Sequence, residues 1–373
     1  MVAAEHVRLL AEAGHDVAIL GAHTEILAEG LPVVARMHVP ATGSGALYSP
    51  SRVDRHCLAD ALRDCAPDLV LVEAWQTALT EAAIDVAADM GIPVVMLSHG
   101  ISVHPYTWQL PDVFRGVGWL WYRWVALPRR MHRLRALAVL DQTSTSPRFF
   151  DRNLAQKLGV PVMGITNSPI HWRHGSAAPS ARKRQILVVG YFSPVKNQLA
   201  ALQVLEKLPA DVAMCFIGRR AGRYYDQCVE LTKSRGLSAR VRYLEDDECD
   251  LAGEIAESLI VLSTSKTEVL PLTLLEAMAS GTPFVATAVG AVPSLAAGLI
   301  ANGHEAQRAA IMRLISDAQL WERKAQEGRL EFERRYTRGA VRDALLKVVE
   351  FAHAAPPVPV RAPSKATSAD QGE

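Results

Sequence analysis

Short apolar runs rich in Val, Ile and Leu recur along the chain, and longer Ala- and Leu-rich amphipathic segments separate them. Parallel sheets covered on both faces by helices produce this alternation, so the sequence predicts an α/β fold with parallel sheets. The predicted strands are Val17–Leu20, Leu69–Val72, Pro93–Leu97, Ala136–Leu140 and Pro161–Ile165 in the first half, and Ile186–Val189, Val212–Ile217, Val241–Leu244, Leu259–Leu262 and Phe284–Thr287 in the second.

The chain has 373 residues, of which 49% are hydrophobic, so it is long enough to bury two cores. Residues 174–184 are small, polar and basic, which is typical of an interdomain linker. We therefore expect an N-terminal domain over residues 1–173 and a C-terminal domain over 185–335. Residues 354–373 are rich in Pro, Ala and Ser without periodicity, which predicts a disordered tail.

The first predicted element is a helix over residues 3–13 that ends at Gly14. A doubly wound domain normally begins with a central strand and a glycine-bearing turn ahead of such a helix. No apolar run precedes this one. The pattern therefore predicts an N-terminal domain without its usual first strand.

The charge balance, the cysteines and the hydropathy of the chain limit its possible partners and its possible location in the cell. There are 40 Lys and Arg residues against 39 Asp and Glu residues, so a net charge of +1 indicates no nucleic-acid partner. The five cysteines form no metal-ligand spacing, which favours a reduced cytoplasmic compartment without structural zinc. No apolar run reaches the roughly 18 residues that span a bilayer, and the N-terminus lacks the apolar core of a signal peptide. We expect a soluble protein.

The segment from Ser263 to Thr287 contains the strongest candidate site. A strand ends at Leu262 and Pro271 is a suitable first helical residue, so the free N–H groups of Leu272 and Thr273 form an anion site beyond a parallel strand. Glu268 lies before this helix and Glu276 within it. A buried carboxylate near phosphate needs hydroxyl donors, which indicates sugar hydroxyls as partners. The alternative is a capping acid and a solvated helix face.

These residues resemble the retaining glycosyltransferases of the GT-B architecture, group one (family four). The resemblance rests on two glutamates eight apart, followed by Ala-Met-Ala, Gly281 and a Thr-Pro-apolar strand. It implies two Rossmann-like domains facing a cleft. It also implies that Glu268 faces the donor sugar, that Glu276 holds the nucleotide ribose, and that a helix over residues 336–353 returns to the first domain. The family usually has Gly-Phe-Gly-Leu where this chain has residues 269–272.

A second motif ends the strand Ile186–Val189 at Gly190 and leads through Lys196 into a helix. A departing nucleoside diphosphate carries negative charges that a fixed cation must offset when no metal is present. Lys196 is the candidate, and the family also places a diphosphate-gripping Lys here. The family has an Arg directly after the glycine, where this chain has Tyr191. The alternative for Lys196 is an exposed lysine at a helix start.

Three further residues lie at or just after strand ends. His99 lies two residues after the predicted strand Pro93–Leu97, and the resemblance implies that it contacts the donor sugar, although a structural histidine is the alternative. Arg219 follows a strand of the second domain and is a candidate to offset the Arg missing at position 191. Leu244 lies where the family seats the nucleotide base through main-chain contacts. The acidic run at 245–250 precedes a helix, so we interpret it as a solvated helix entry and not as a metal site.

Residues 112–135 contain three Trp and six Arg against a single acid. Amphipathic aromatics with cations suit the headgroup level of an anionic bilayer, or a lipid-linked acceptor held there. The alternative is a connecting helix with inward-packed aromatics and solvated arginines.

The resemblance implies a retaining transferase that moves a sugar from a nucleoside-diphosphate sugar to an acceptor hydroxyl without a metal cofactor. We expect a role in polysaccharide, glycolipid or glycoconjugate synthesis, in the cytoplasm or at the inner face of the membrane. The alternatives are a non-hydrolysing sugar-nucleotide epimerase, a catalytically degraded binding partner and a peripheral membrane adaptor.

Overall fold

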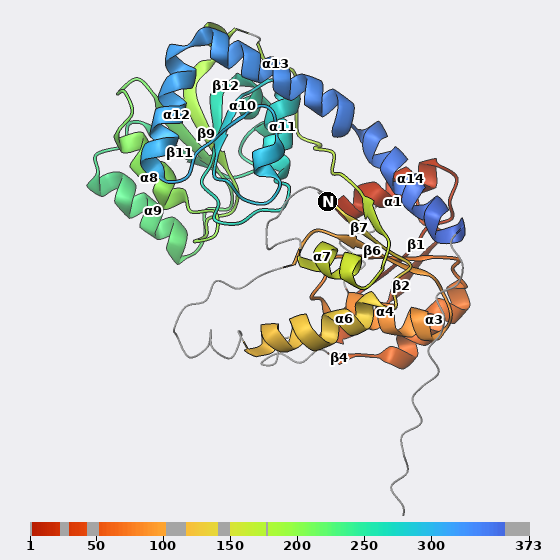
Figure 1. The fold of residues 1–373 in the computed structure, drawn as a ribbon. Helices are drawn as coiled ribbons and strands as arrows, with labels where there is room; N and C mark the ends of the chain where they lie inside the picture. Colours follow the sequence, from red (N-terminus) through yellow and green to blue (C-terminus); the bar gives the residue numbers. More distant parts are fainter. Residues whose placement is uncertain are drawn as a thin grey trace, which may run out of the picture.

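The computed structural model describes residues 2–22, 30–42, 52–101, 117–140, 150–176 and 178–354. Its strands form the two parallel α/β units that the sequence predicts (Figure 1). The strand bounds are β1 (Ala18–Gly21), β2 (Ala35–His38), β3 (Ala41–Thr42), β4 (Arg52–Val53), β5 (Val70–Glu73), β6 (Val94–Ser98), β7 (Ala136–Val139), β8 (Val162–Gly164), β9 (Lys183–Val189), β10 (Ala213–Ile217), β11 (Val241–Leu244), β12 (Ser258–Ser263), β13 (Phe284–Ala286) and β14 (Gly298–Ile300).

The helices cover both faces of these sheets. Their bounds are α1 (Val2–Glu12), α3 (Arg55–Cys65), α4 (Ala78–Asp89), η1 (Tyr122–Ala126), α6 (Leu127–Met131), α7 (Phe150–Lys157), η3 (Pro179–Ala181), α8 (Gln198–Glu206), α9 (Arg223–Ser234), α10 (Leu251–Glu257), α11 (Leu272–Ser280), η4 (Val292–Ser294), α12 (His304–Ser316), α13 (Ala318–Arg335) and α14 (Arg338–Ala354). None of the helices in the described ranges has the length and apolar character needed to span a membrane.

The N-terminal domain has a parallel sheet in the order β5-β6-β7-β8 and a separate parallel pair, β1-β2. β3 and β4 pair antiparallel. Apolar residues of α3 and α4 pack on one face of the larger sheet, whereas residues of α1 and α14 pack on the other. No strand precedes α1 among the described residues, and β1 and β5 do not pair with each other.

The C-terminal domain has a six-stranded parallel sheet in the order β11-β10-β9-β12-β13-β14. The middle residues of its central strands are apolar and buried: Leu187, Ile217 and Val261 are each 1% exposed or less. The order reverses between β9 and β12, which follow each other in space but not in sequence. In parallel sheets, ligands bind beyond the carboxyl ends of the strands at such a reversal.

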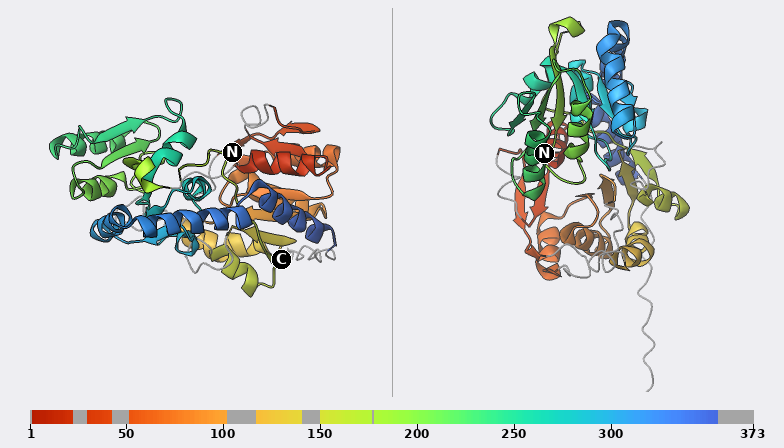
Figure 2. Two further views of the ribbon diagram at one scale, coloured as in Figure 1. Left: turned by 90° about the horizontal axis from the view of Figure 1, so that it is seen from above. Right: turned by 90° about the vertical axis from the view of Figure 1, so that its left-hand side faces the viewer.

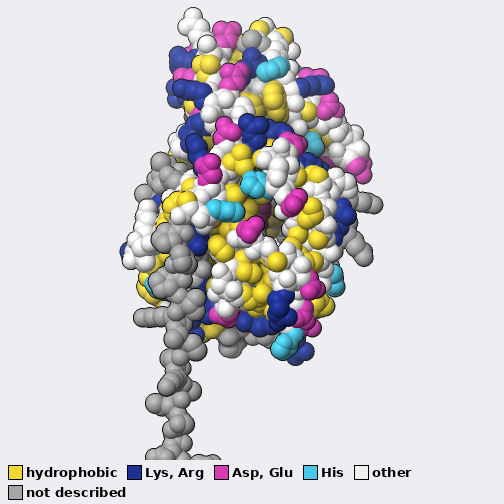
Figure 3. Space-filling view, turned by 90° about the vertical axis from the view of Figure 1, so that its right-hand side faces the viewer, with side chains coloured by type: hydrophobic (Ala, Val, Ile, Leu, Met, Phe, Trp, Pro, Cys, Tyr) yellow, Lys and Arg dark blue, Asp and Glu magenta, His cyan; other side chains and the backbone are white. Residues whose placement is uncertain are grey.

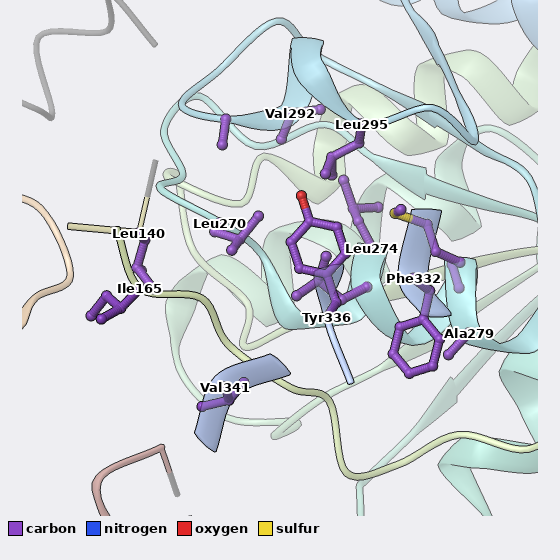
Figure 4. Packing of buried hydrophobic residues seen from close by; sticks show 14 of the residues in the cluster. Leu140, Ile165, Leu270, Leu274, Ala279, Val292, Leu295, Phe332, Tyr336 and Val341 are labelled. Carbon is purple, nitrogen blue, oxygen red and sulfur yellow. The ribbon is translucent and has the colours of Figure 1, made fainter. Parts of the chain in front are cut away.

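A continuous apolar cluster joins the two domains. Leu140, after β7, and Ile165, after β8, belong to the same buried cluster as Leu270 and Leu274 of the C-terminal domain. Figure 4 shows Leu140 and Ile165 lying opposite Leu270, with Val341 of α14 nearby. The carboxyl ends of the N-terminal strands therefore approach the loop that precedes α11.

The chain crosses between the domains twice. Residues 165–176 lead into the C-terminal domain, and α13 and α14 return along one side of the molecule to α1 (Figures 1 and 2). Arg338, at the start of α14, forms ion pairs with Glu5 and Glu12 of α1.

On the face shown in Figure 3, cationic and anionic side chains are interspersed, and apolar side chains surround a hollow.

Two details differ from the sequence-based expectations. Arg182, near the end of the predicted linker, is only 6% exposed, and β9 already begins at Lys183. The linker therefore ends inside the C-terminal domain. The returning helix begins at Arg338 and ends at Ala354, whereas residues 355–373 of the predicted tail lie outside the described residues.

Candidate functional site

Lys196 and Glu268 meet at the carboxyl end of the C-terminal sheet. Lys196 lies between β9 and α8, and Glu268 lies between β12 and α11. The Nζ atom of Lys196 is 2.6 Å from Oε1 of Glu268, and the two side chains are 22% and 13% exposed. β9 and β12 are neighbours in the sheet, so their carboxyl-terminal loops bring the two charges together.

Hydrogen bonds hold the two loops together. The Thr264 hydroxyl donates to the carbonyl oxygens of Lys196 (3.0 Å) and Asn197 (2.9 Å). The N–H of Lys266 donates to the carbonyl oxygen of Val195 at 2.8 Å. Because both main chains are fixed, the Lys196–Glu268 pair has a defined position.

The start of α11 offers main-chain donors beside this pair. Pro271 has extended backbone angles and is the N-cap residue, so the helix begins at Leu272 and not at Pro271 as expected. The N–H groups of Leu272 and Thr273 make no hydrogen bond within the described part of the chain. The two residues are half-buried and lie four and five positions after Glu268. A helix start with open N–H groups attracts anions.

Glu276 is a buried residue of α11. It is 4% exposed on α11. Burial raises the pKa of its carboxyl to about 7, although a backbone hydrogen bond from His171 lowers it. Glu276 therefore lies under the interdomain segment that contains His171.

The ends of β9 and β10 approach each other closely. A side chain at Gly218 would overlap the main chain of Gly190, so glycine is required there. The next residue, Arg219, is exposed, and its guanidinium group has no hydrogen bond or ion pair among the described residues. Arg220, in contrast, is paired with Glu245 and Glu248. Arg219 is therefore the arginine of this pair that is available to a ligand.

Leu244 ends the edge strand β11 and is half-buried. Its carbonyl oxygen accepts a hydrogen bond of 3.0 Å from the N–H of Gly218. The main chain predicted to seat a nucleotide base thus lies directly against the turn that carries Arg219.

His99 directly follows β6 in the N-terminal domain, and its partner is an acid that the sequence analysis did not select. Its Nε2 atom lies 3.4 Å from Oε2 of Glu73, at the end of β5. The other carboxylate oxygen of Glu73 lies 2.6 Å from Nδ1 of His6 on α1. Burial raises the pKa of Glu73, but the hydrogen bonds from His6 and His99 outweigh it and lower the pKa to about 2.

A second buried acid fixes the backbone next to His99. Asp151 is fully buried at the start of α7, and its carboxylate accepts hydrogen bonds from the Ser98 hydroxyl and from Trp75 Nε1. The Ser98 hydroxyl oxygen also accepts from the N–H of Gly100. Burial raises the pKa of Asp151 above its usual value, and the hydrogen bonds from Ser98 and Trp75 offset only part of this rise. Asp151 therefore connects the segment that follows β5 to the end of β6.

The structure thus brings Lys196 and Glu268 into contact and places the open amides of Leu272 and Thr273 a few residues away. Glu276, Arg219 and Leu244 lie on the same domain, and His99 lies on the other. Glu73, His6 and Asp151 were missed. The available signal for Glu73 is that it directly follows a predicted parallel strand, Leu69–Val72, as His99 follows another.

Two parallel α/β domains with charged residues at facing strand ends define the GT-B type of architecture. Residues 174–331 match the family model described as Glycosyl transferases group 1. The D-inositol 3-phosphate glycosyltransferase of Mycobacterium tuberculosis is 34% identical over 131 residues, which are 33% of this chain and 27% of that protein. The enzyme of the same name from Mycobacterium bovis matches to the same extent. The match thus spans about a quarter of the length of these curated relatives.

Solved structures match over nearly the whole chain. HepE from Anabaena, in complex with UDP, has a TM-score of 0.70 at 17% identity and covers 93% of this chain and 96% of its own. A glycosyltransferase from Rickettsia africae has a TM-score of 0.69 at 15% identity, with 94% of each chain covered. Sucrose-phosphate synthase from Thermosynechococcus elongatus has a TM-score of 0.67 at 14% identity, covering 93% of this chain and 91% of its own.

At these identities the structural likeness shows the fold, and it confirms the predicted GT-B arrangement of two α/β domains. The family match is confined to residues 174–331, and the fold is of the GT-B type. They do not favour the epimerase or the non-catalytic alternative.

Proposed function

We propose that the protein transfers a glycosyl group from a nucleoside-diphosphate sugar to an acceptor hydroxyl, with retention of the anomeric configuration. The observation that carries this proposal is the Lys196–Glu268 pair beside the open amides of Leu272 and Thr273. An ammonium group and a helix start suit a diphosphate, and a carboxylate suits sugar hydroxyls. The family match over residues 174–331 covers these groups.

In the proposed reaction, the bond between the anomeric carbon and the diphosphate oxygen breaks, and that carbon bonds to the acceptor oxygen. Lys196 and the amides of α11 would stabilise the negative charge that grows on the diphosphate. Glu268 and His99 would orient the sugar, and Glu276 the ribose. These roles need no metal, so we expect activity to persist with a chelator present.

The neighbours suggest the donor to test first. HepE from Anabaena has been solved with UDP and with UDP-glucose. We therefore propose a UDP-sugar as donor and a carbohydrate or lipid-linked hydroxyl as acceptor. Incubation with UDP-glucose and a panel of acceptors, followed by NMR of the anomeric proton of the product, tests transfer and retention together. Inversion would contradict retention, and a changed donor sugar without acceptor would identify an epimerase.

Binding measurements test the site itself. Lys196→Ala should weaken UDP binding about 10- to 100-fold, because a hydrogen bond to a charged group contributes about 1.5–3 kcal/mol. Lys207→Ala is the matched control, since Lys207 also pairs with a glutamate, Glu305, and follows the far end of α8. Titration calorimetry measures both. Equal affinity in Lys196→Ala and wild type would contradict the assignment.

We also propose that the N-terminal domain contacts an anionic membrane surface, at the inner face of the cytoplasmic membrane, through the helical segment 117–131. Val117, Leu120, Trp121 and Trp124 are 54%, 46%, 50% and 66% exposed. Their spacing of three, four and seven residues places them on one helix face. Arg129, on the same segment, is exposed and has no ion pair among the described residues. Apolar side chains with cations suit an anionic lipid surface.

The helical segment 117–131 lies within the segment 112–135 that the sequence predicts to contact a membrane. Residues 112–116 of that segment lie outside the described part of the chain. The double variant Trp121→Ser, Trp124→Ser should lose sedimentation with vesicles of anionic phospholipid. Leu330→Ser is the matched control, because Leu330 is 48% exposed on α13. Equal sedimentation of the double variant and the wild type would contradict this contact.

A further inference from the structure

Glu73 connects two histidines that are far apart in sequence. One carboxylate oxygen lies 2.6 Å from Nδ1 of His6, and the other lies 3.4 Å from Nε2 of His99. His6 is 4% exposed, whereas the side chains of Glu73 and His99 are 23% and 26% exposed. The buried histidine therefore lies on one side of the acid, and the more accessible one on the other.

The chemistry of the acid determines how His99 is presented. Glu73 is ionised, because the hydrogen bonds of the two histidines outweigh its burial and lower its pKa to about 2. An ionised carboxylate only accepts hydrogen bonds, so the ring nitrogen that faces it must carry a proton. In neutral His99 the proton is then on Nε2 and the lone pair is on Nδ1. Nδ1 of His99 has no hydrogen-bond partner among the described residues.

His99 lies where its Nδ1 atom could contact a ligand between the domains. Leu140 and Ile165 follow the neighbouring strands β7 and β8, and they pack in one cluster with Leu270 of the opposite domain. Ser98 pairs in register with Val139, directly before Leu140. His99 therefore stands at the strand edge that faces the loop of Glu268.

We propose that Glu73 is a positioning residue that holds His99 with Nδ1 toward the donor sugar, and that His6 in turn fixes Glu73. This inference rests on the proposed function and names the residues that set the orientation of His99 in that site. Nδ1 accepts a hydrogen bond from a sugar hydroxyl, and the carboxylate prevents the ring from turning its N–H toward the ligand. His6 acts only through Glu73.

The direct test is the tautomer of His99 in Glu73→Gln. Imidazole nitrogen chemical shifts, assigned by comparison with His99→Asn and recorded where histidine is neutral, should show the Nε2–H form in wild type. Glu73→Gln should populate both forms, because a carboxamide both donates and accepts. Identical tautomer populations in the two proteins would overturn the proposal. This readout needs no donor, so a failure of the proposed transfer reaction leaves it intact.

The kinetic test separates sugar positioning from nucleotide binding. Glu73→Gln should lower kcat/KM for the UDP-sugar about 10- to 100-fold, as misplacement of a catalytic group does. Its affinity for UDP, which lacks the sugar, should stay at the wild-type value. Asp85→Asn is the control, because Asp85 is an ion-paired acid of the same domain on α4. Equal losses of UDP affinity and kcat/KM would overturn the proposal.

His6→Asn is the second variant, and it keeps the experiment decisive if Glu73→Gln does not fold. Loss of His6 leaves the contact between Glu73 and His99 but frees the acid to move. The same two readouts should change in the same direction and by less than in Glu73→Gln. Wild-type tautomer populations together with wild-type kcat/KM in a folded His6→Asn would contradict the role of His6.

Discussion

The ammonium group of Lys196 lies 2.6 Å from the carboxylate of Glu268, so the free protein neutralises the cation that we assign to the donor diphosphate. Both side chains are largely buried, at 22% and 13% exposed, and their attraction is less screened than at an open surface. A diphosphate that binds Lys196 competes with this carboxylate. We therefore expect Glu268 to have two opposing effects: it should weaken diphosphate binding and also orient the sugar.

Removal of the carboxylate charge should separate these effects. In Glu268→Gln we expect UDP to bind about three- to tenfold more tightly, since a partly exposed ion pair contributes about 1 kcal/mol that the ligand must overcome. Transfer from the UDP-sugar should fall about 100-fold or more, because the sugar loses a charged hydrogen-bond acceptor. Titration calorimetry and initial rates measure the two quantities.

The control for this prediction is Glu305→Gln, which removes the acid partner of Lys207 far from the site. It should change neither UDP affinity nor transfer. A Glu268→Gln variant that binds UDP more weakly than wild type would show that Glu268 supports the diphosphate site instead of opposing it.

The strands are predictable from the sequence where their residues are uniformly apolar. The runs at 93–97 and 136–140 correspond to β6 and β7, whose residues are all buried. β2 reads Ala-Arg-Met-His and alternates between half-buried and exposed positions, so it has no apolar run to detect. β14 has only three residues, of which one is Gly298. Short or half-exposed strands form because they pair with neighbouring strands in the folded protein, and the local sequence pattern does not reveal this pairing.

The residues of the candidate site can be predicted from the sequence where they belong to a local motif. Glu268, Lys196 and the start of α11 belong to strand–loop–helix motifs whose spacing is visible in the chain. The partner of His99 is 26 residues away, and the partner of Glu73 on α1 is 67 residues away. Those contacts arise only when β5 and β6 lie side by side beneath α1, so spacing alone does not reveal them.

Glu276 should make stability depend on pH. Burial raises the pKa of its carboxyl from 4.5 to about 7, so between these values the folded state binds a proton that the unfolded state has released. Stability then falls as pH rises through this window. Glu276→Gln lacks this effect, and at pH 8 it should be more stable than wild type by up to about 3 kcal/mol.

Urea denaturation of wild type and Glu276→Gln at several pH values checks this expectation. The difference in unfolding free energy should grow between pH 4.5 and 7 and level off above it. A difference that stays constant over this range would show that Glu276 titrates alike in both states.

Arg182 should be the main stabilising residue of the linker region. Its guanidinium group is buried and donates to the carbonyl oxygens of Ala256 and Gly281 and to the hydroxyl of Thr282. Arg182→Ala leaves these buried acceptors without donors, so we expect a loss of about 3 kcal/mol or more of unfolding free energy. Arg184→Ala removes an exposed ion pair two residues away and should cost at most about 1 kcal/mol. Urea denaturation compares them, and equal losses would contradict the buried role of Arg182.

Tyr191 offers a gain-of-function test of the nucleotide site. It is 59% exposed, directly follows Gly190, and its ring centroid lies 5.9 Å from Nζ of Lys196. The family that this chain resembles has an arginine at this position. Tyr191→Arg would therefore add a second cation beside Lys196. We expect UDP to bind about three- to tenfold more tightly, with a steeper dependence on salt. Ile170→Arg adds the same charge at a site that is 52% exposed in the interdomain segment, and it should leave UDP affinity unchanged. If both variants tighten binding equally, the gain comes from net charge, and position 191 does not border the diphosphate.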